Sequence, residues 1–277
     1  MILSAFGFSL MAVCVKLASG QGIPVLEIVA ARALVSLFLS YIAVRRKGIS
    51  LLGHKKHLLL SRGVVGALAL MCVYYAITHL PLAEATVLQY LHPMFTAVLA
   101  FAFLKERIQA STLLSVVFSF IGLLLVARPE ILFGVSKSDF SLLAISAAVL
   151  GAFGSAVAYV LVRKLNETED ASVIIFYFPV VALPISLGLL GSDFIMPEGW
   201  TWLTLLLVGV FTQIGQIGLT KAMKTETASK ATAFSYLQVV FAVLLGWGIF
   251  GEIPDLWVVL GGGLILFGAI INVFWKR

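Results

Sequence analysis

Arg32 draws attention first, because it lies within an apolar run, residues 28–44, that holds no other charged side chain. An arginine in an apolar medium costs about 2.5 kcal/mol or more unless the guanidinium faces a polar cavity or a partner. Guanidinium groups bind carboxylates through two parallel hydrogen bonds. Arg32 is therefore either a binding group for an anionic or carboxylate-bearing substrate, or a structural partner of Glu27, Glu84 or free backbone carbonyls.

Tyrosine, glutamine and serine side chains recur in other apolar runs, at depths where polar groups need partners. Their rings and amides would suit an amphipathic metabolite, and the aromatic faces would suit a cation. Hydrogen bonding between helices is the alternative role for about half of them. With Arg32, the candidate substrate-binding residues are Tyr75, Gln89, Tyr90, Tyr159, Tyr177, Gln213, Gln216, Ser235, Tyr236 and Gln238.

Two prolines within apolar runs are candidate hinges. Pro93 removes the helical hydrogen bond to the Gln89 carbonyl, and Pro179 removes the one to Ile175, so each is expected to kink its helix. The freed carbonyls could bind substrate, although prolines also occur in membrane helices without such a role. His92, next to Pro93, is a candidate protonation switch; simple hydrogen bonding within a helix bundle is the alternative.

The composition indicates what kind of scaffold holds these residues. Of the 277 residues, 61% are hydrophobic and 12% are charged, about half the roughly 25% charge of a soluble domain. Membrane-spanning helices need roughly 20 apolar residues, and spans in lipid must satisfy their own backbone groups. The sequence therefore predicts an all-α membrane protein of ten transmembrane helices, near 1–18, 28–44, 63–80, 85–104, 108–127, 140–162, 171–191, 199–220, 231–250 and 256–275.

The first of these runs lacks the basic segment that precedes a cleaved signal peptide, so we expect it to be a short first span. Alternating the ten spans puts 15 of the 19 Lys and Arg residues on one side and 3 on the other, with Arg32 within a span. The positive-inside rule then predicts that both termini are cytoplasmic. The connection between the second and third spans contributes most to this bias, with Arg45, Arg46, Lys47, Lys55, Lys56 and Arg62.

The chain partly matches itself at a shift of 146 residues, which pairs Thr86 with Thr232, Tyr90 with Tyr236, Glu106 with Glu252 and Gly122 with Gly268. This match predicts two five-helix repeats, residues 1–128 and 139–276. Because five is odd, the second repeat enters the membrane inverted, a plan that recurs in secondary transporters with a site near the midplane between the halves. Glu106 and Glu252 are expected to stabilise the positive N-terminal ends of the helices that follow them.

The residues around the fourth and ninth spans resemble the EamA family of the drug/metabolite transporter superfamily. The first repeat carries Ala83-Glu84-Ala85-Thr86-Val87, Pro93, Phe95 and Leu104-Lys105-Glu106, and the second carries Ala231-Thr232, Tyr236-Leu237 and Phe250-Gly251-Glu252. Arg128-Pro129 followed by Leu132-Phe133-Gly134 is similar to the solute carrier branch of that superfamily. The resemblance covers nearly the whole chain and implies a ten-helix exporter or exchanger with a central cavity. Val239 departs from the pattern, because it occupies the position of Pro93.

Taken together, these observations predict a secondary transporter of small organic metabolites, such as amino acids, carboxylates or amphipathic drugs, that works by alternating access. A channel or lipid scramblase is the alternative, and a membrane-embedded enzyme is a weaker one because no nucleophile cluster, metal motif or ATP-binding loop is present. We expect no cofactor and no nucleic acid. The expected partners are a small-molecule substrate, the bilayer, and a coupling proton or counter-substrate, with the protein a monomer or homodimer in the inner (plasma) membrane.

Overall fold

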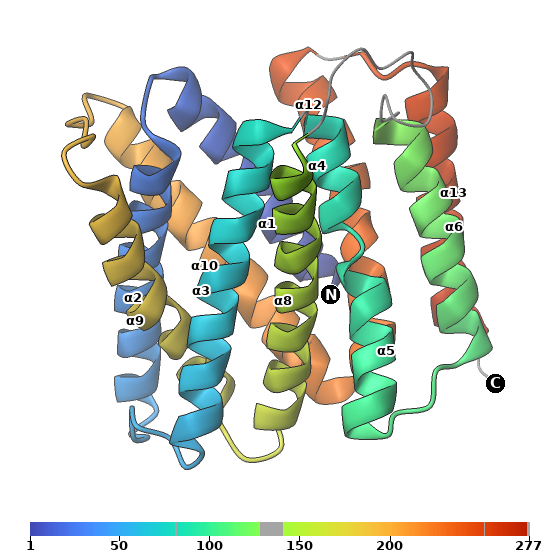
Figure 1. Ribbon diagram of the computed structural model, residues 1–277, viewed down its shortest axis with the longest axis horizontal. Coiled ribbons are helices and arrows are strands. Elements are labelled where there is room, and N and C mark those ends of the chain that lie inside the picture. Colours follow the sequence, from blue (N-terminus) through green and yellow to red (C-terminus); the bar gives the residue numbers. More distant parts are fainter. Residues whose placement is uncertain (81, 128–140, 252, 276–277) are drawn as a thin grey trace. The chain divides into compact units, whose positions relative to one another are not determined.

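A computed structural model describes residues 1–80, 82–127, 141–251 and 253–275, except for the side chains of residues 78 and 82–84. Its elements are almost entirely α-helical (Figure 1). They are α1 (Ile2–Gly20), α2 (Val25–Arg46), α3 (Lys56–His79), α4 (Leu82–Gln89), α5 (His92–Leu104), α6 (Ala110–Ala127), α8 (Leu142–Leu165), α9 (Ala171–Leu190), α10 (Thr201–Thr225), α11 (Ala228–Ala233), the 3-10 turn η1 (Phe234–Tyr236), α12 (Leu237–Phe250) and α13 (Leu256–Phe274).

Ten helical stretches in the described part of the chain are long and apolar enough to cross a bilayer, as predicted. The prediction of an all-helical, multi-pass membrane protein is therefore confirmed. The third span begins earlier than expected, at Lys56 rather than at residue 63. Arg62, which was assigned to a cytoplasmic connection, lies inside α3 and is 3% exposed.

The fourth predicted span, 85–104, is two helices rather than one kinked helix. α4 ends at Gln89, α5 begins at His92, and Pro93 occupies the first turn of α5. Proline fits that position because the first amides of a helix have no intrahelical partner. The chain therefore starts a new helix there, and Figure 1 shows the break between the two labelled segments.

The described helices form two compact units, and each unit takes segments from both ends of the chain. Unit 1 comprises residues 1–67 and 161–225, and unit 2 comprises residues 68–160 and 226–277. Neither unit coincides with a predicted repeat. The packing partners of a helix in either unit are thus found largely in the other half of the sequence.

In unit 1, α10 packs against α1 and α2, and α2 also packs against α9. Small residues permit these contacts: a Cβ on Gly7 would lie 2.9 Å from the Gly215 amide nitrogen, and a Cβ on Gly209 would overlap Val35. Asp170 caps the N-terminus of α9: its carboxylate accepts a hydrogen bond from the Ser172 amide at 2.8 Å and pairs with Lys47 at 2.7 Å. These contacts hold the end of α2 beside the start of α9.

In unit 2, α6 and α13 lie side by side and antiparallel (Figure 1). A Cβ on Gly122 would lie 2.5 Å from the Gly261 carbonyl oxygen, and Thr112 hydrogen-bonds Asn272 at 3.1 Å near the other end of the pair. A Cβ on Gly268 would meet Ser115 and Ser119 at 2.8–2.9 Å. Small residues spaced four apart let membrane helices approach this closely. We call this contact the α6–α13 seam.

Glu106 contacts a helix N-terminus that is distant in sequence. Its carboxylate accepts a hydrogen bond at 2.8 Å from the Ala228 amide, at the first residue of α11, and thus caps α11. Negative charge at a helix N-terminus is stabilising. Glu252, Arg128, Lys137 and the side chain of Glu84 lie outside the described part of the chain.

Candidate functional site

Unit 1 contains a cluster of cationic, aromatic and amide side chains formed by Arg32, Arg62, Phe178 and Gln216, which we call the arginine cluster. The Arg32 and Arg62 guanidinium carbons lie 5.7 Å and 4.9 Å from the centre of the Phe178 ring. Both arginines are buried, at 7% and 3% exposure. The Gln216 amide oxygen lies 3.4 Å from Nη2 of Arg62. The four residues come from four different helices: Arg32 from α2, Arg62 from α3, Phe178 from α9 and Gln216 from α10.

Arg32 has weak protein partners among the described residues. Its Nη1 meets the Met11 sulfur at 3.8 Å, and its Nε has no hydrogen-bond partner there. Glu27, the expected structural partner that can be examined, accepts instead a hydrogen bond from the Ile195 amide at 3.0 Å. The Arg32 guanidinium could therefore donate hydrogen bonds to a bound carboxylate without first breaking a strong bond within the protein.

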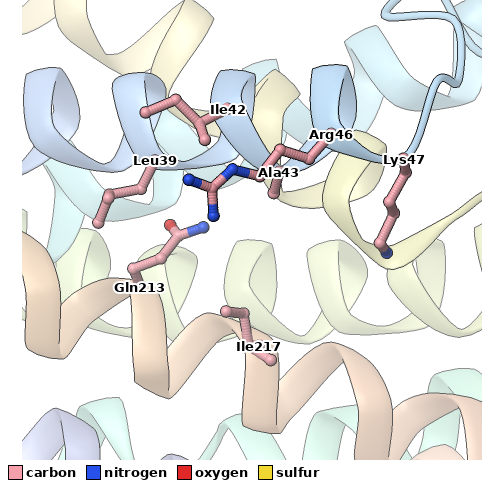
Figure 2. Close-up of a pocket in the computed structure, with 7 residues that line it drawn as sticks. All are labelled: Leu39, Ile42, Ala43, Arg46, Lys47, Gln213 and Ile217. Atoms are coloured by element: carbon pink, nitrogen blue, oxygen red, sulfur yellow. The ribbon is translucent and has the colours of Figure 1, made fainter.

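Gln213, the other glutamine predicted on α10, is held by two serines of α2. Its amide oxygen accepts from Ser36 at 2.6 Å and its amide nitrogen donates to Ser40 at 2.9 Å. This is hydrogen bonding between helices, the alternative role considered for such residues. The amide also borders a pocket of about 450 Å³ whose other lining residues, shown in Figure 2, are Leu39, Ile42, Ala43, Arg46, Lys47 and Ile217.

The pocket of Figure 2 is lined mainly by apolar side chains, and its two cationic residues, Arg46 and Lys47, come from the C-terminal end of α2. Arg46 extends back along α2, so that its guanidinium points toward the Gln213 amide, while Lys47 lies farther along the chain (Figure 2). Lys47 is engaged by Asp170, at 2.7 and 2.9 Å from the two carboxylate oxygens. Because Lys47 is paired with Asp170, the positive charge of the pocket comes mainly from Arg46.

Unit 2 contains a second cluster, formed by Tyr90, His92, Tyr159, Ser235 and Tyr236, which we call the tyrosine cluster. The Tyr90 and Tyr236 rings stack at 5.5 Å, and the Tyr236 hydroxyl donates to the Tyr90 carbonyl at 2.9 Å. The His92 ring contacts Tyr159 edge-on at 5.3 Å. Its Nδ1 lies 3.1 Å from the Gln89 carbonyl oxygen, and its Nε2 lies 3.3 Å from the Ser235 hydroxyl.

The tyrosine cluster sits at the break between α4 and α5, where Pro93 cannot donate to the Gln89 carbonyl. His92 contacts that carbonyl instead. Tyr236 in turn satisfies the carbonyl of Tyr90, one residue further on. The aromatic side chains thus replace backbone hydrogen bonds that a continuous helix would have made.

Other predicted residues lie apart from these two clusters. Tyr75 is 36% exposed and stacks on His79. The Tyr177 hydroxyl donates to the Leu52 carbonyl at 3.1 Å, which ties α9 to the segment before α3. Gln89 and Gln238 are half-buried at the ends of α4 and the start of α12. Pro179 lies within α9, as does Pro184, which sequence reasoning did not single out.

Arg62 and Phe178 are members of the arginine cluster that sequence reasoning missed. A signal for Arg62 was present: the charge-free run at 63–80 is short for a bilayer, so the helix had to extend toward its N-terminus. That extension carries Arg62 into the span. Phe178 carries no such signal, because one phenylalanine in an apolar run is indistinguishable from a packing residue.

Comparison with known proteins gives a consistent result. The family model described as the EamA-like transporter family matches residues 1–128 and 142–274. The pseudopaline exporter CntI of Pseudomonas aeruginosa is 35% identical over 270 residues, covering 97% of this chain and 93% of that protein. Solute carrier family 35 member G1 of Homo sapiens is 32% identical over 282 residues, covering 98% and 76%. A solved crystal structure has the same fold, with a TM-score of 0.82 at 19% identity over 99% of this chain and 97% of that one.

Proposed function

Since this chain belongs to the EamA-like transporter family, whose members are non-enzymatic transporters, we propose that it is a secondary transporter that exports or exchanges small organic metabolites by alternating access. The pseudopaline exporter at 35% identity favours export of a metabolite. Amino acids, carboxylates and amphipathic drugs are the substrate classes to examine. Within unit 1, the residues proposed to contact substrate are Arg32 and Gln216. The substrate contacts predicted for Tyr90, Ser235 and Tyr236, which lie in unit 2, stay a separate prediction.

The single observation that carries this proposal is Arg32. It is 7% exposed, and among the described residues its Nε has no hydrogen-bond partner. Burying such a group is costly unless something binds it. In a transporter, binding of a substrate at this site would offset the cost of burying the charge.

Many transporters that work by alternating access are built from two related halves, and helix boundaries support the proposed repeats at 1–128 and 139–276. Matched helices begin or end 146 residues apart, the same separation as Tyr90 and Tyr236. The family model also matches twice along the chain. The matching boundaries are Val25 and Ala171, Leu82 and Ala228, Leu104 and Phe250, and Ala110 and Leu256.

The α6–α13 seam supports inversion of the second repeat. Under the 146-residue shift, Gly122 corresponds to Gly268 and Ser115 to Gly261. Gly122 contacts Gly261, and Gly268 contacts Ser115, so each helix makes the equivalent contact on the other. Such reciprocity, between antiparallel helices, is what a two-fold axis within the membrane plane produces. Tyr90 and Tyr236, which contact each other, would then lie near that axis.

Orientation and membrane remain part of the proposal. The excess of Lys and Arg at one set of helix ends supports cytoplasmic termini in the inner (plasma) membrane. A reporter active only in the cytoplasm, fused after residue 277, tests the orientation; an inactive reporter would contradict it. A coupling proton or a counter-substrate, and a monomeric or homodimeric state, stay predictions.

The proposal is tested by a thermal-shift screen of the purified protein against amino acids, carboxylates, nucleosides and cationic drugs. Each compound that stabilises the protein is then assayed for counterflow in proteoliposomes. We expect saturable counterflow of at least one compound. Single-channel conductance, or lipid movement between leaflets without solute exchange, would instead support a channel or a scramblase.

Arg32→Ala is expected to abolish counterflow of that compound while leaving a folded, monodisperse protein. The reason is that the substitution removes the guanidinium without breaking a strong bond within the protein. Transport by proteoliposomes and size-exclusion chromatography check the two parts. Loss of the folded protein would instead indicate a structural role for Arg32.

A further inference from the structure

The pocket of Figure 2 lies within unit 1, between α2 and α10, at the C-terminal end of α2. Its volume of about 450 Å³ falls in the range of roughly 300–1,000 Å³ that is usual for ligand sites. Along α2 its lining runs from Leu39 to Arg46, the last residue of the helix, which is about 10 Å along the helix axis. The pocket therefore extends from the end of a membrane span into the span.

The apolar lining of the pocket continues into helix faces that expose large apolar side chains. On α2, Ile42 lies four residues from Phe38, which is 63% exposed. On α10, Gln213 and Ile217 follow Leu206, which is 49% exposed. Residues four or seven apart in an α-helix share a face. In a membrane protein such exposed apolar faces suit acyl chains, which are as apolar as leucine.

The buried face of α10 is a different one. Thr212, Gln216, Leu219 and Met223, which share a face by their spacing, are all buried. None of them lines the pocket. The pocket thus lies at the edge of the contact between α2 and α10, next to the exposed face of each helix, where lipid can reach it.

Arg46 contributes a positive charge to this pocket. Its side chain extends back along α2, so that the guanidinium points toward the Gln213 amide (Figure 2). Long cationic side chains near helix ends usually extend toward the membrane–water interface instead. No hydrogen bond or ion pair joins Arg46 to another residue in the described part of the chain. The guanidinium is therefore placed to bind an anionic group that enters the pocket.

The three acidic residues between α8 and α9 are engaged elsewhere. Glu167 pairs at 2.9 Å with a lysine of α8. Glu169 accepts hydrogen bonds from two backbone amides, and Asp170 pairs with Lys47 at 2.7 Å. These carboxylates thus do not neutralise Arg46, although Asp170 lies beside the next residue of the chain.

We propose that this pocket binds a phospholipid with an anionic headgroup. Its phosphate pairs with Arg46, and one acyl chain lies against Leu39, Ile42 and Ile217. The planar guanidinium fork matches phosphate oxygens, and basic pockets between membrane helices suit acidic lipid headgroups. The apolar lining favours a lipid over a soluble phosphate, because burying an acyl chain adds hydrophobic free energy. The proposal concerns a bound lipid and does not depend on which metabolite is transported.

The test is native mass spectrometry of the full-length protein released from nanodiscs. The nanodiscs contain equal amounts of phosphatidylglycerol and phosphatidylcholine with identical acyl chains. We expect the retained phosphatidylglycerol to exceed phosphatidylcholine about fivefold or more, the ratio that one basic side chain near the membrane surface supports. Equal retention of the two lipids would overturn the proposal.

Substitution of Arg46 assigns the headgroup contact. Arg46→Gln should bring the ratio of the two lipids close to one, whereas Arg46→Lys, which keeps the charge, should retain a preference for phosphatidylglycerol. Arg45→Gln is the matched control, because Arg45 lies against the ring of Tyr41 and does not line the pocket. It should leave the ratio unchanged. A wild-type ratio in Arg46→Gln would contradict the proposed contact.

A second variant tests the acyl-chain contact. Ala43→Phe places a large side chain in the pocket and should reduce retention of both lipids. Ala102→Phe adds the same side chain at an exposed position of α5 and should change nothing. Wild-type retention in a folded Ala43→Phe protein would show that no acyl chain occupies the pocket.

Competition separates a lipid from a soluble anion. A large excess of glycerol 1-phosphate, which has the phosphate but no acyl chain, should not displace phosphatidylglycerol. Displacement would overturn the lipid proposal and indicate a site for soluble phosphates.

Stability in detergent gives an independent readout. A ligand that binds only the folded protein stabilises it, so added phosphatidylglycerol should raise the thermal midpoint of the wild type more than that of Arg46→Gln. Equal increases in the two proteins would contradict binding at Arg46.

Discussion

At the scale of single residues, the Tyr236 hydroxyl is a defined structural contact. It donates to the Tyr90 carbonyl at the break between α4 and α5, and the Tyr236 side chain is fully buried. Tyr236→Phe keeps the stacked ring and leaves that carbonyl without its donor. We expect a loss of about 1 kcal/mol of stability, seen as a thermal midpoint lower by a few degrees in detergent.

Tyr41→Phe is the matched control, because Tyr41 is 42% exposed and its ring, against which Arg45 lies, is retained. It should leave the midpoint unchanged. Equal effects of the two substitutions would show that the Tyr236 hydroxyl contributes nothing specific.

At the residue scale, the sequence singles out polar groups that are conspicuous in an apolar run. Arg32 and Gln216 were selected in this way, and the structure places both in the arginine cluster. Arg62 was missed because it lies close to a helix end. Lys and Arg residues near helix ends were attributed to the positive-inside rule, which concerns membrane orientation. The contact between Tyr90 and Tyr236 follows from tertiary packing, which sequence spacing alone does not give.

At the scale of elements, Asp170 joins two helix ends. Partial burial raises the pKa of this carboxyl, but hydrogen bonds from Lys47 and from Ser172 outweigh that effect, so its pKa lies below the ordinary value. A carboxylate with a lowered folded-state pKa stabilises the protein above its ordinary pKa of about 3.9. That stability is lost as the pH falls through the lower folded-state value.

Asp170→Ala should therefore cost about 1 kcal/mol at neutral pH, the usual effect of losing an N-cap residue. The difference from wild type should shrink as the pH falls below about 4. Thermal midpoints across a pH series check this. Glu167→Gln, in the same loop and paired only with Lys164 at the surface, is the control and should have little effect at any pH. A pH-independent cost would show that the charge of Asp170 is irrelevant.

Element-scale prediction identified all ten spans, because apolar length is a strong signal in a membrane protein. It failed at the fourth span, where Pro93 was expected to bend one helix and instead begins a new one. It also did not indicate that the Glu106 carboxylate accepts a hydrogen bond from the first amide of α11. Both features depend on neighbouring elements, which sequence proximity does not show.

At the scale of the whole molecule, the α6–α13 seam joins the two halves of the sequence within unit 2. Gly122→Ala would place a methyl group 2.5 Å from the Gly261 carbonyl oxygen, so the helices must move apart. Overpacking of this kind costs about 1–3 kcal/mol. We expect a lower thermal midpoint and a loss of monodisperse protein in detergent.

Gly262→Ala is the control on α13, because an added Cβ there meets nothing within 4 Å. Alanine has the higher helix propensity, by about 1 kcal/mol, so this substitution should leave the protein as stable as wild type or slightly more stable. If Gly122→Ala behaved in the same way, the seam would not be closely packed.

The interleaving of the two halves was the feature of the whole molecule that sequence reasoning did not anticipate. The internal match divides the chain into consecutive repeats, whereas each compact unit draws segments from both. Contact between distant segments depends on which small residues face each other, as Gly122 and Gly261 do. Pattern matching along the chain compares the repeats but does not show that they pair.

The two helices of the seam are synthesised at different times, because they lie far apart in the sequence. Translation proceeds at about 5–20 residues per second, so on the order of 7 to 30 s separate the completion of α6 at Ala127 from that of α13 at Phe274. During that interval the glycine face of α6 borders lipid or an insertion factor, because its partner has not yet been made. A ribosome that stalls in between leaves a fragment with an unpaired helix face, which is the kind of product that membrane proteases remove.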